Sequence, residues 1–244
     1  MTVGVLAGWV VVVDENGPPR GCAIFSVMFY LIGVNHEAQR HLPSAKPDED
    51  QSKLERCLVE AIEQFHPILI AVEESEETLI ERKKGACITY ESIPRNVAMR
   101  HRIQPMLFEP SEDYKSKYGY LDESMILLEL FTAGLFRDVP SNQQRVAAMA
   151  LQIAVFFPIR EKFWIEMLQD YLELDVIVVL GENHIESFSR RLQALSVPFK
   201  VLYRQIGVSD TQLAECSAAQ RFPIDNPALF RKMLEQFTGS RALG

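Results

Sequence analysis

The tetrapeptide Gly-X-Asn-His occurs twice in the chain, each time after an apolar run of the kind that forms a buried strand. The copies are Gly33–His36, after Phe29–Ile32, and Gly181–His184, after Val176–Leu180. A histidine at the end of a strand can serve as a general base or as a metal ligand. Because glycine has no Cβ, we expect it to let the backbone turn sharply and approach a ligand.

Carboxylates follow two other predicted strands. Glu73 and Glu74 come directly after Ile68–Val72, and Glu109 comes after Met106–Phe108. Two imidazoles and a carboxylate form a metal-binding set that leaves positions open for water. Without a metal, the same groups could activate water directly. An acidic helix start is the alternative for the two adjacent glutamates, because negative side chains are stabilised near a helix N-terminus.

We therefore predict one site at the strand ends. Its predicted catalytic residues are His36, Glu73, His184 and Arg160. The first three are also the predicted ligands of a divalent metal, with manganese, cobalt and zinc as the ions considered. The predicted substrate-binding residues are Asn35, Glu74, Glu109, Glu182 and Asn183. Arg160 would neutralise the carboxylates or hold an oxyanion, with a salt bridge to Glu161 or Glu166 as the alternative.

Several well-known motifs are absent from the sequence. It contains no GxGxxG, no GxxxxGK[ST], no GxSxG and no HExxH. Dinucleotide-dependent redox chemistry, P-loop phosphoryl transfer and serine-hydrolase chemistry are disfavoured, and we predict no nucleotide cofactor.

Strand and helix patterns alternate from Met28 onward. The segment Phe199–Tyr203 is the last of five predicted strands. Strands separated by helices pair in parallel through right-handed crossovers. We therefore predict a three-layer α/β sandwich with a mainly parallel central sheet and helices on both faces. Ligands of such sheets bind beyond the carboxyl ends of the strands, which is where the polar groups above lie.

Apolar residues at helical spacing predict the helices between and after these strands. The predicted helices are 48–65, 121–136, 143–173, 185–195 and 226–237. Pro158 should break or kink the third of them, because proline lacks the backbone N–H. The polar segment Ser111–Tyr120 is predicted to be a loop that closes over the substrate.

The first 27 residues suit two hypotheses. Gly8–Val13 and Cys22–Val27 could pair as a hairpin around Asn16-Gly17, a common hairpin turn. Alternatively, residues 1–27 are an extension upstream of the functional protein. Residues 28–244 are predicted to form a single α/β domain.

The composition is that of an ordinary globular protein: 244 residues, 48% hydrophobic, with 33 acidic and 25 basic side chains and a net charge of −8. A nucleic-acid partner is disfavoured, because the most basic stretch, 95–102, has only three arginines and a histidine. No apolar run reaches the ~20 residues of a membrane helix, and the four cysteines lack metal or disulfide spacing. We expect a cytoplasmic protein without a membrane partner.

The motifs together resemble the TraB/Tiki superfamily, which includes erythromycin esterase and the ChaN-like haem-binding proteins. The resemblance covers about residues 28–203 and is carried by the two GxxH motifs, Ala71–Glu74 and Arg160–Trp164. It implies a core of His36, Glu73 and His184 with Arg160 as electrostatic support. The peptidase-like branch continues with Asp and Arg where this chain has Ser75 and Thr78, which leaves the esterase-like branch, the ChaN-like branch or an uncharacterised one.

We therefore expect a hydrolase of an ester or amide bond, acting on a small-molecule or peptide substrate and assisted by a metal. The alternatives are a non-catalytic metal- or haem-binding protein, a metal-dependent phosphodiesterase, and an interaction module without a ligand. The sequence leaves the oligomeric state open, a homodimer included.

Overall fold

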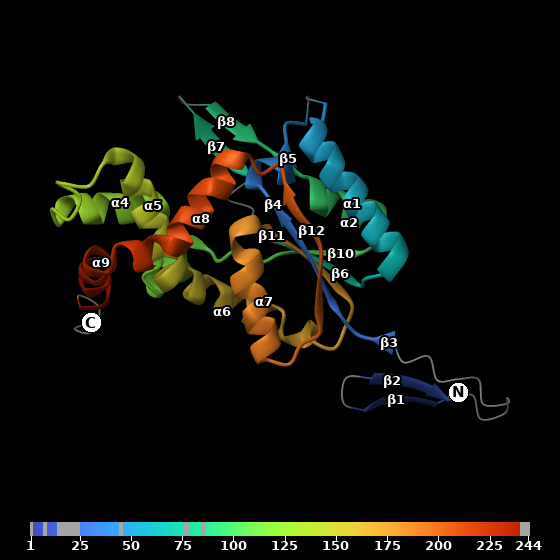
Figure 1. The fold of residues 1–244 in the computed structure, drawn as a ribbon. Helices are drawn as coiled ribbons and strands as arrows, with labels where there is room; N and C mark the ends of the chain where they lie inside the picture. The colour runs from blue at the N-terminus through green and yellow to red at the C-terminus, as the bar shows by residue number, and fades with distance from the viewer. Residues whose placement is uncertain are drawn as a thin grey trace. The chain divides into compact units, whose positions relative to one another are not determined.

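Five strands form a parallel sheet in the order β10-β6-β11-β4-β12 (Figure 1). The computed structural model describes residues 2–6, 9–13, 25–43, 46–75, 79–83 and 86–239. The five strands are β4 (Phe29–Val34), β6 (Leu69–Val72), β10 (Gln104–Leu107), β11 (Val176–Gly181) and β12 (Phe199–Ile206). Each of them matches a strand predicted from the sequence.

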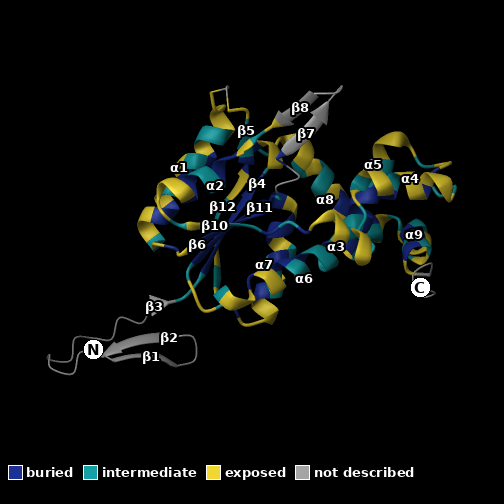
Figure 2. Cartoon of the chain, turned by 180° about the vertical axis from the view of Figure 1, so that it is seen from behind, coloured by how far each residue is buried: buried dark blue, intermediate teal, exposed yellow. Residues whose placement is uncertain are grey.

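Helices cover both faces of this sheet, which confirms the predicted three-layer α/β fold. α1 (Glu49–Phe65) and α2 (Ile93–Arg100) pack on one face through a shared hydrophobic core. α7 (Ile185–Ala194) packs against β4 and β12 on the other face. Every residue of β4, β6 and β11 is buried (Figure 2), as expected of parallel strands that are covered on both sides.

Helix α1 shows how the sequence sets these elements. Its N-cap is Asp48, whose carboxylate accepts a hydrogen bond from the Gln51 N–H, while the Gln51 side chain accepts one from the Asp48 N–H. This reciprocal capping satisfies two donors that the first turn leaves without partners. Leu54 and Leu58 then lie fully buried against the sheet, as their spacing predicts.

The connections out of the central strands place a crevice at their carboxyl ends. β4 leads into α1 on one face, whereas its neighbour β11 leads into α7 on the other. Adjacent strands whose connections leave to opposite faces open a crevice, which is the usual ligand site of α/β sheets. β6 flanks β11 on its other side. The residues that follow β6, β11 and β4 therefore meet at one edge of the sheet.

The chain divides into two compact units. The first, Met1–Phe108 with Met167–Gly207, contains the sheet, and the second comprises Glu109–Glu166 and Val208–Gly244. Residues 28–244, predicted as one domain, are distributed over both. The helices of the second unit are α3 (Glu112–Lys117), α4 (Glu123–Thr132), α5 (Ser141–Leu151), most of α6 (Phe157–Met167), α8 (Asp210–Asp225) and α9 (Pro227–Gly239). A separate hydrophobic core contains residues of α4, α5, α8 and α9.

Two predictions concern the second unit. The helix does not break at Pro158, because α6 continues through this residue to Met167. It is irregular just upstream, where residues 152–156 form a π-helical turn in which the Phe157 N–H donates to the Gln152 carbonyl. This wider turn ends two residues before Pro158, which has no N–H to donate. The loop predicted for Ser111–Tyr120 was wrong, since α3 begins after Ser111, whose side chain caps it by accepting from the Tyr114 N–H.

Several short strands escaped prediction. β5 (Arg40–His41) pairs with β9 (Glu91–Ser92), and β7 (Ile80–Lys83) pairs with β8 (Ala86–Thr89). Near the N-terminus, β1 (Thr2–Leu6), β2 (Trp9–Val13) and β3 (Phe25–Ser26) form a small antiparallel sheet. The pairing of β2 with β3 agrees with the predicted hairpin, whose turn at Asn16-Gly17 lies outside the described residues.

A search of the described helices finds none with the length and apolar character needed to cross a membrane. Among the described residues, Cys57 lies in the core of the first unit and Cys216 is partly exposed on α8.

Candidate active site

The carboxylate of Glu73 lies between two imidazoles at the carboxyl end of the sheet. Its Oε1 atom is 3.4 Å from Nε2 of His36 and 3.8 Å from Nε2 of His184. The Glu73 side chain is fully buried and that of His184 is 3% exposed, whereas that of His36 is 48% exposed. The structure therefore brings together the three residues predicted as the core of the site, and His36 is the one that faces solvent.

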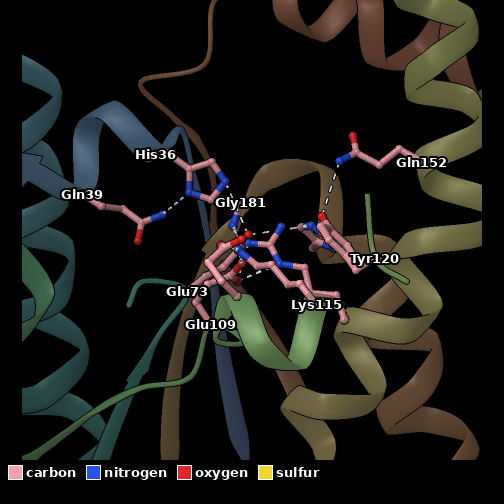
Figure 3. A network of polar contacts seen from close by, with 11 residues as sticks. His36, Gln39, Glu73, Glu109, Lys115, Tyr120, Gln152 and Gly181 are labelled. Carbon is pink, nitrogen blue, oxygen red and sulfur yellow. Dashed lines mark hydrogen bonds and ion pairs between the residues drawn. The ribbon is translucent and has the colours of Figure 1, made fainter. Parts of the chain in front are cut away.

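Backbone pairing at the strand ends holds Glu73 in this position. Its N–H donates to the Val179 carbonyl, which continues the ladder between β6 and β11. Its Oε2 atom accepts a hydrogen bond of 2.5 Å from the Gly181 N–H (Figure 3). A buried carboxylate is costly unless donors surround it, and here a backbone N–H and the two imidazoles are in place to stabilise its charge.

The two motif glycines provide space rather than a special backbone conformation, which corrects the expectation of a sharp glycine turn. A Cβ on Gly181 would lie 3.0 Å from Nε2 of His36, and a Cβ on Gly33 would lie 2.2 Å from Oε2 of Glu182. Neither glycine has a positive φ angle. Each glycine thus makes room for a side chain of the other motif.

The asparagine of the first motif shapes the turn that carries His36. The Asn35 side-chain oxygen accepts from the Glu37 N–H at 3.3 Å and caps the 3₁₀ turn His36–Gln39. Its side-chain amide donates to the Gly207 carbonyl at 3.0 Å, which ties the turn to the end of β12. These contacts assign Asn35 a positioning role, and the substrate contact predicted for it stays a prediction.

Glu182 of the second motif is buried and bridges the ends of β11 and β12. Its Oε1 atom accepts from Nε of Arg204 at 2.7 Å, and its Oε2 atom accepts from the Gln205 N–H at 2.9 Å. Asn183, the next residue along, is exposed. Of the two residues predicted to bind substrate in this motif, Asn183 is therefore the one that solvent reaches.

Glu74 is buried directly beside Glu73. Burial raises the pKa of its carboxyl to about 7, against the lowering effects of the Ser92 hydroxyl and then of Arg40, while the Glu73 charge raises the pKa further. A carboxyl with this pKa carries a proton for much of the time near neutral pH. Near neutral pH it therefore adds less than a full negative charge to that of its neighbour.

Glu109 and Arg160 bond to each other within the second unit. Nε of Arg160 donates to Oε2 of Glu109 at 2.7 Å, and the Lys115 ammonium lies 3.2 Å from Oε1 of Glu109 (Figure 3). The Arg160 guanidinium also stacks over the ring of Trp164 at 5.0 Å. Glu109 is thus one partner of Arg160, and the alternative salt bridge to Glu161 or Glu166 stays a prediction. The roles predicted for Arg160 and Glu109 in the site stay predictions.

Two further residues escaped the sequence analysis. Gln39 is fully buried, and its Nε2 atom lies 3.3 Å from Nδ1 of His36 (Figure 3). Its position three residues after His36 in a short polar segment was the available signal, since residues i and i+3 align on a 3₁₀ helix. Arg204 lies in the last predicted strand, and nothing in its local sequence points to the second motif.

Whether His36, Glu73 and His184 could bind a metal ion depends on how their donor atoms are arranged. No group of three His, Cys, Asp or Glu side chains within the described ranges is arranged to hold a metal ion. The Nε2 atoms of His36 and His184 lie 3.4 and 3.8 Å from one oxygen of Glu73, distances that suit ion pairs.

Comparisons of the chain with protein-family models, with curated proteins and with solved structures find no match. The resemblance to the TraB/Tiki superfamily therefore stays a prediction that depends on short motifs.

Proposed function

We propose that the chain is a hydrolase that cleaves an ester or amide bond with water activated by His36. One observation carries the proposal: the exposed imidazole of His36 lies against the buried carboxylate of Glu73, at 3.4 Å. A carboxylate behind a histidine orients the ring and stabilises the imidazolium that forms when the ring takes up a proton. General acid–base catalysis often uses such a pair of a histidine and a carboxylate.

In the proposed reaction, His36 removes a proton from a water molecule as the water oxygen attacks the carbonyl carbon. The bond from that carbon to the leaving oxygen or nitrogen then breaks, and the imidazolium returns its proton to the leaving group. Glu73 keeps its negative charge throughout and offsets the positive charge on His36. His184, whose Nε2 atom lies 3.8 Å from the same Oε1 atom of Glu73, limits the positions that this carboxylate can adopt.

The developing oxyanion needs a donor at the exposed side of the site. Asn183 is exposed on the 3₁₀ turn Glu182–His184, and its side-chain amide supplies N–H groups. We assign it the oxyanion contact, since such donors are worth a factor of about 10²–10³ in rate.

The proposal is tested by the release of chromophore from p-nitrophenyl esters and p-nitroanilides, with bis-p-nitrophenyl phosphate as the phosphodiester. We expect turnover of an ester or anilide by the wild type and its loss in His36→Ala. His101→Ala is the matched control, because His101 is an exposed histidine at the end of α2. Equal rates in wild type and His36→Ala would contradict the proposal, and turnover of the phosphodiester alone would favour the phosphodiesterase instead.

A further inference from the structure

Both ring nitrogens of His36 have a partner, and the two partners differ in what they can do. Nε2 lies 3.4 Å from Oε1 of Glu73, and Nδ1 lies 3.3 Å from the side-chain Nε2 of Gln39. An ionised carboxylate only accepts hydrogen bonds, whereas an amide NH₂ group only donates. A neutral imidazole that satisfies both partners must carry its proton on Nε2 and accept at Nδ1.

The position of Gln39 is fixed by its surroundings. Its side chain is fully buried, and it ends the 3₁₀ turn that begins at His36. The next residue, Arg40, pairs with Ser92 in the short β5–β9 sheet, so the backbone around Gln39 is held from a second element. The amide therefore approaches His36 from a fixed direction.

The opposite orientation of the Gln39 amide would favour the other tautomer of the His36 ring. With its oxygen toward His36, Gln39 would require a proton on Nδ1, and the lone pair of Nε2 would then point at the Glu73 carboxylate. Two acceptors at this separation repel each other. The observed orientation also leaves one polar atom unsatisfied: within the described residues, the buried Oε1 atom of Gln39 has no hydrogen-bond partner. Such an atom is rare in folded proteins and calls for an explanation.

We propose that Gln39 is a positioning residue that sets the tautomer of His36, with the proton on Nε2 and the basic lone pair on Nδ1. The proton then points at Glu73, and the water that His36 activates must approach Nδ1. The contact of 3.3 Å is long for a hydrogen bond between nitrogens, so a water molecule can compete with the amide for this lone pair. The tautomer of His36 can be observed without any reaction, whereas an effect of Gln39 on the reaction rate rests on the proposed function.

The test is nuclear magnetic resonance of the ¹⁵N-labelled imidazoles, without substrate and at a pH where His36 is neutral. We expect a protonated Nε2 and an unprotonated, hydrogen-bonded Nδ1 in the wild type. Gln39→Met keeps the length of the side chain and removes the amide, and we expect the Nδ1 signal to move toward that of a nitrogen without a donor. Gln39→Glu replaces the donor by an acceptor, and we expect it to draw a proton to Nδ1.

Gln104→Met is the matched control, since Gln104 is an exposed glutamine of the same unit, and it should leave both His36 signals in place. A wild-type proton on Nδ1, rapid exchange between the tautomers, or signals unchanged in folded Gln39→Met or Gln39→Glu would overturn the proposal. With the ester or anilide turned over by the wild type, Gln39→Met should lower kcat about tenfold with KM unchanged. Absence of hydrolysis together with the expected ring signals would contradict the proposed function alone.

Discussion

The imidazole of His36 occupies the space that a side chain on Gly181 would fill, with Nε2 3.0 Å from the position of the missing Cβ. The same Cβ would lie 3.4 Å from Oε2 of Glu73. The first motif, at the end of β4, thus packs against the second motif, at the end of the neighbouring strand β11. The second motif needs a glycine because the first motif's histidine lies against it.

Gly181→Ala should therefore displace His36 without disturbing the backbone. Gly181 has φ −57° and ψ 138°, angles that alanine adopts freely, so crowding is the main expected effect. We expect the rate of hydrolysis to fall about 100-fold, as for a reacting group moved by a fraction of its contact distance. Circular dichroism should show an intact fold. In a His36→Ala background, Gly181→Ala should have little effect on stability. Equal destabilisation in both backgrounds would contradict the packing of His36 against Gly181.

The pKa of Glu74 predicts how stability depends on pH. This carboxyl has a pKa of about 7 in the folded chain, raised by burial from 4.5. As the pH rises from 4.5 through 7, the unfolded chain releases its proton first, so the free energy of unfolding falls. The loss approaches about 3 kcal/mol, the equivalent of that pKa difference.

Glu74→Gln should remove this contribution. Urea unfolding should show equal stability of variant and wild type near pH 4.5, and a more stable variant above pH 7. Glu63→Gln is the control, because Glu63 is an exposed residue of α1, and it should follow the wild type at every pH. A constant difference between Glu74→Gln and wild type across this range would show that Glu74 does not titrate as described.

Glu182 is expected to matter for stability more than for substrate binding. Glu182→Gln keeps the shape but loses the charge that holds Arg204 and the Gln205 N–H. We expect a loss of about 1–3 kcal/mol in the free energy of unfolding. Glu186→Gln on α7 is the matched control, since its contact with Arg190 is exposed and 4.0 Å long. A change in KM for Glu182→Gln, with stability retained, would instead support the substrate contact predicted from the sequence.

The metal predicted from the sequence can be tested separately. Untagged protein is incubated with manganese, cobalt or zinc, desalted, and analysed by plasma mass spectrometry. If His36, Glu73 and His184 are ligands, the wild type should retain nearly one ion per chain and the His36→Ala/His184→Ala variant should retain none. Equal metal content in the two proteins would contradict this ligand set.

The sequence was sufficient to predict the sheet and the proximity of His36, Glu73 and His184. Continuous apolar runs such as Val176–Leu180 are typical of strands covered on both faces, and each of the five became a strand. Because parallel strands end at one edge, the order of strands and polar residues along the chain already predicts that His36, Glu73 and His184 meet. These inferences depend on local pattern and on one rule of topology.

The remaining features depend on contacts between distant segments. The carboxylate of Glu182 meets Arg204 only because β11 and β12 flank the same strand, β4. The side chains that lie against Gly33 and Gly181 likewise come from a neighbouring strand end. The sequence alone does not show whether a glycine is needed for the space it leaves or for a backbone conformation. Gln39 was missed because its effect depends on the direction of one side-chain amide.

The central claim is that His36 and Glu73 act as one catalytic unit, and a double-mutant cycle on hydrolysis tests it most directly. His36→Ala and Glu73→Gln are each expected to lower kcat/KM about 10³-fold or more, the size of effect seen when an acid–base pair is broken. Since neither residue would function without the other, the double variant should be no slower than the slower single variant. Losses that multiply in the double variant, or a double variant as active as the wild type, would contradict the claim.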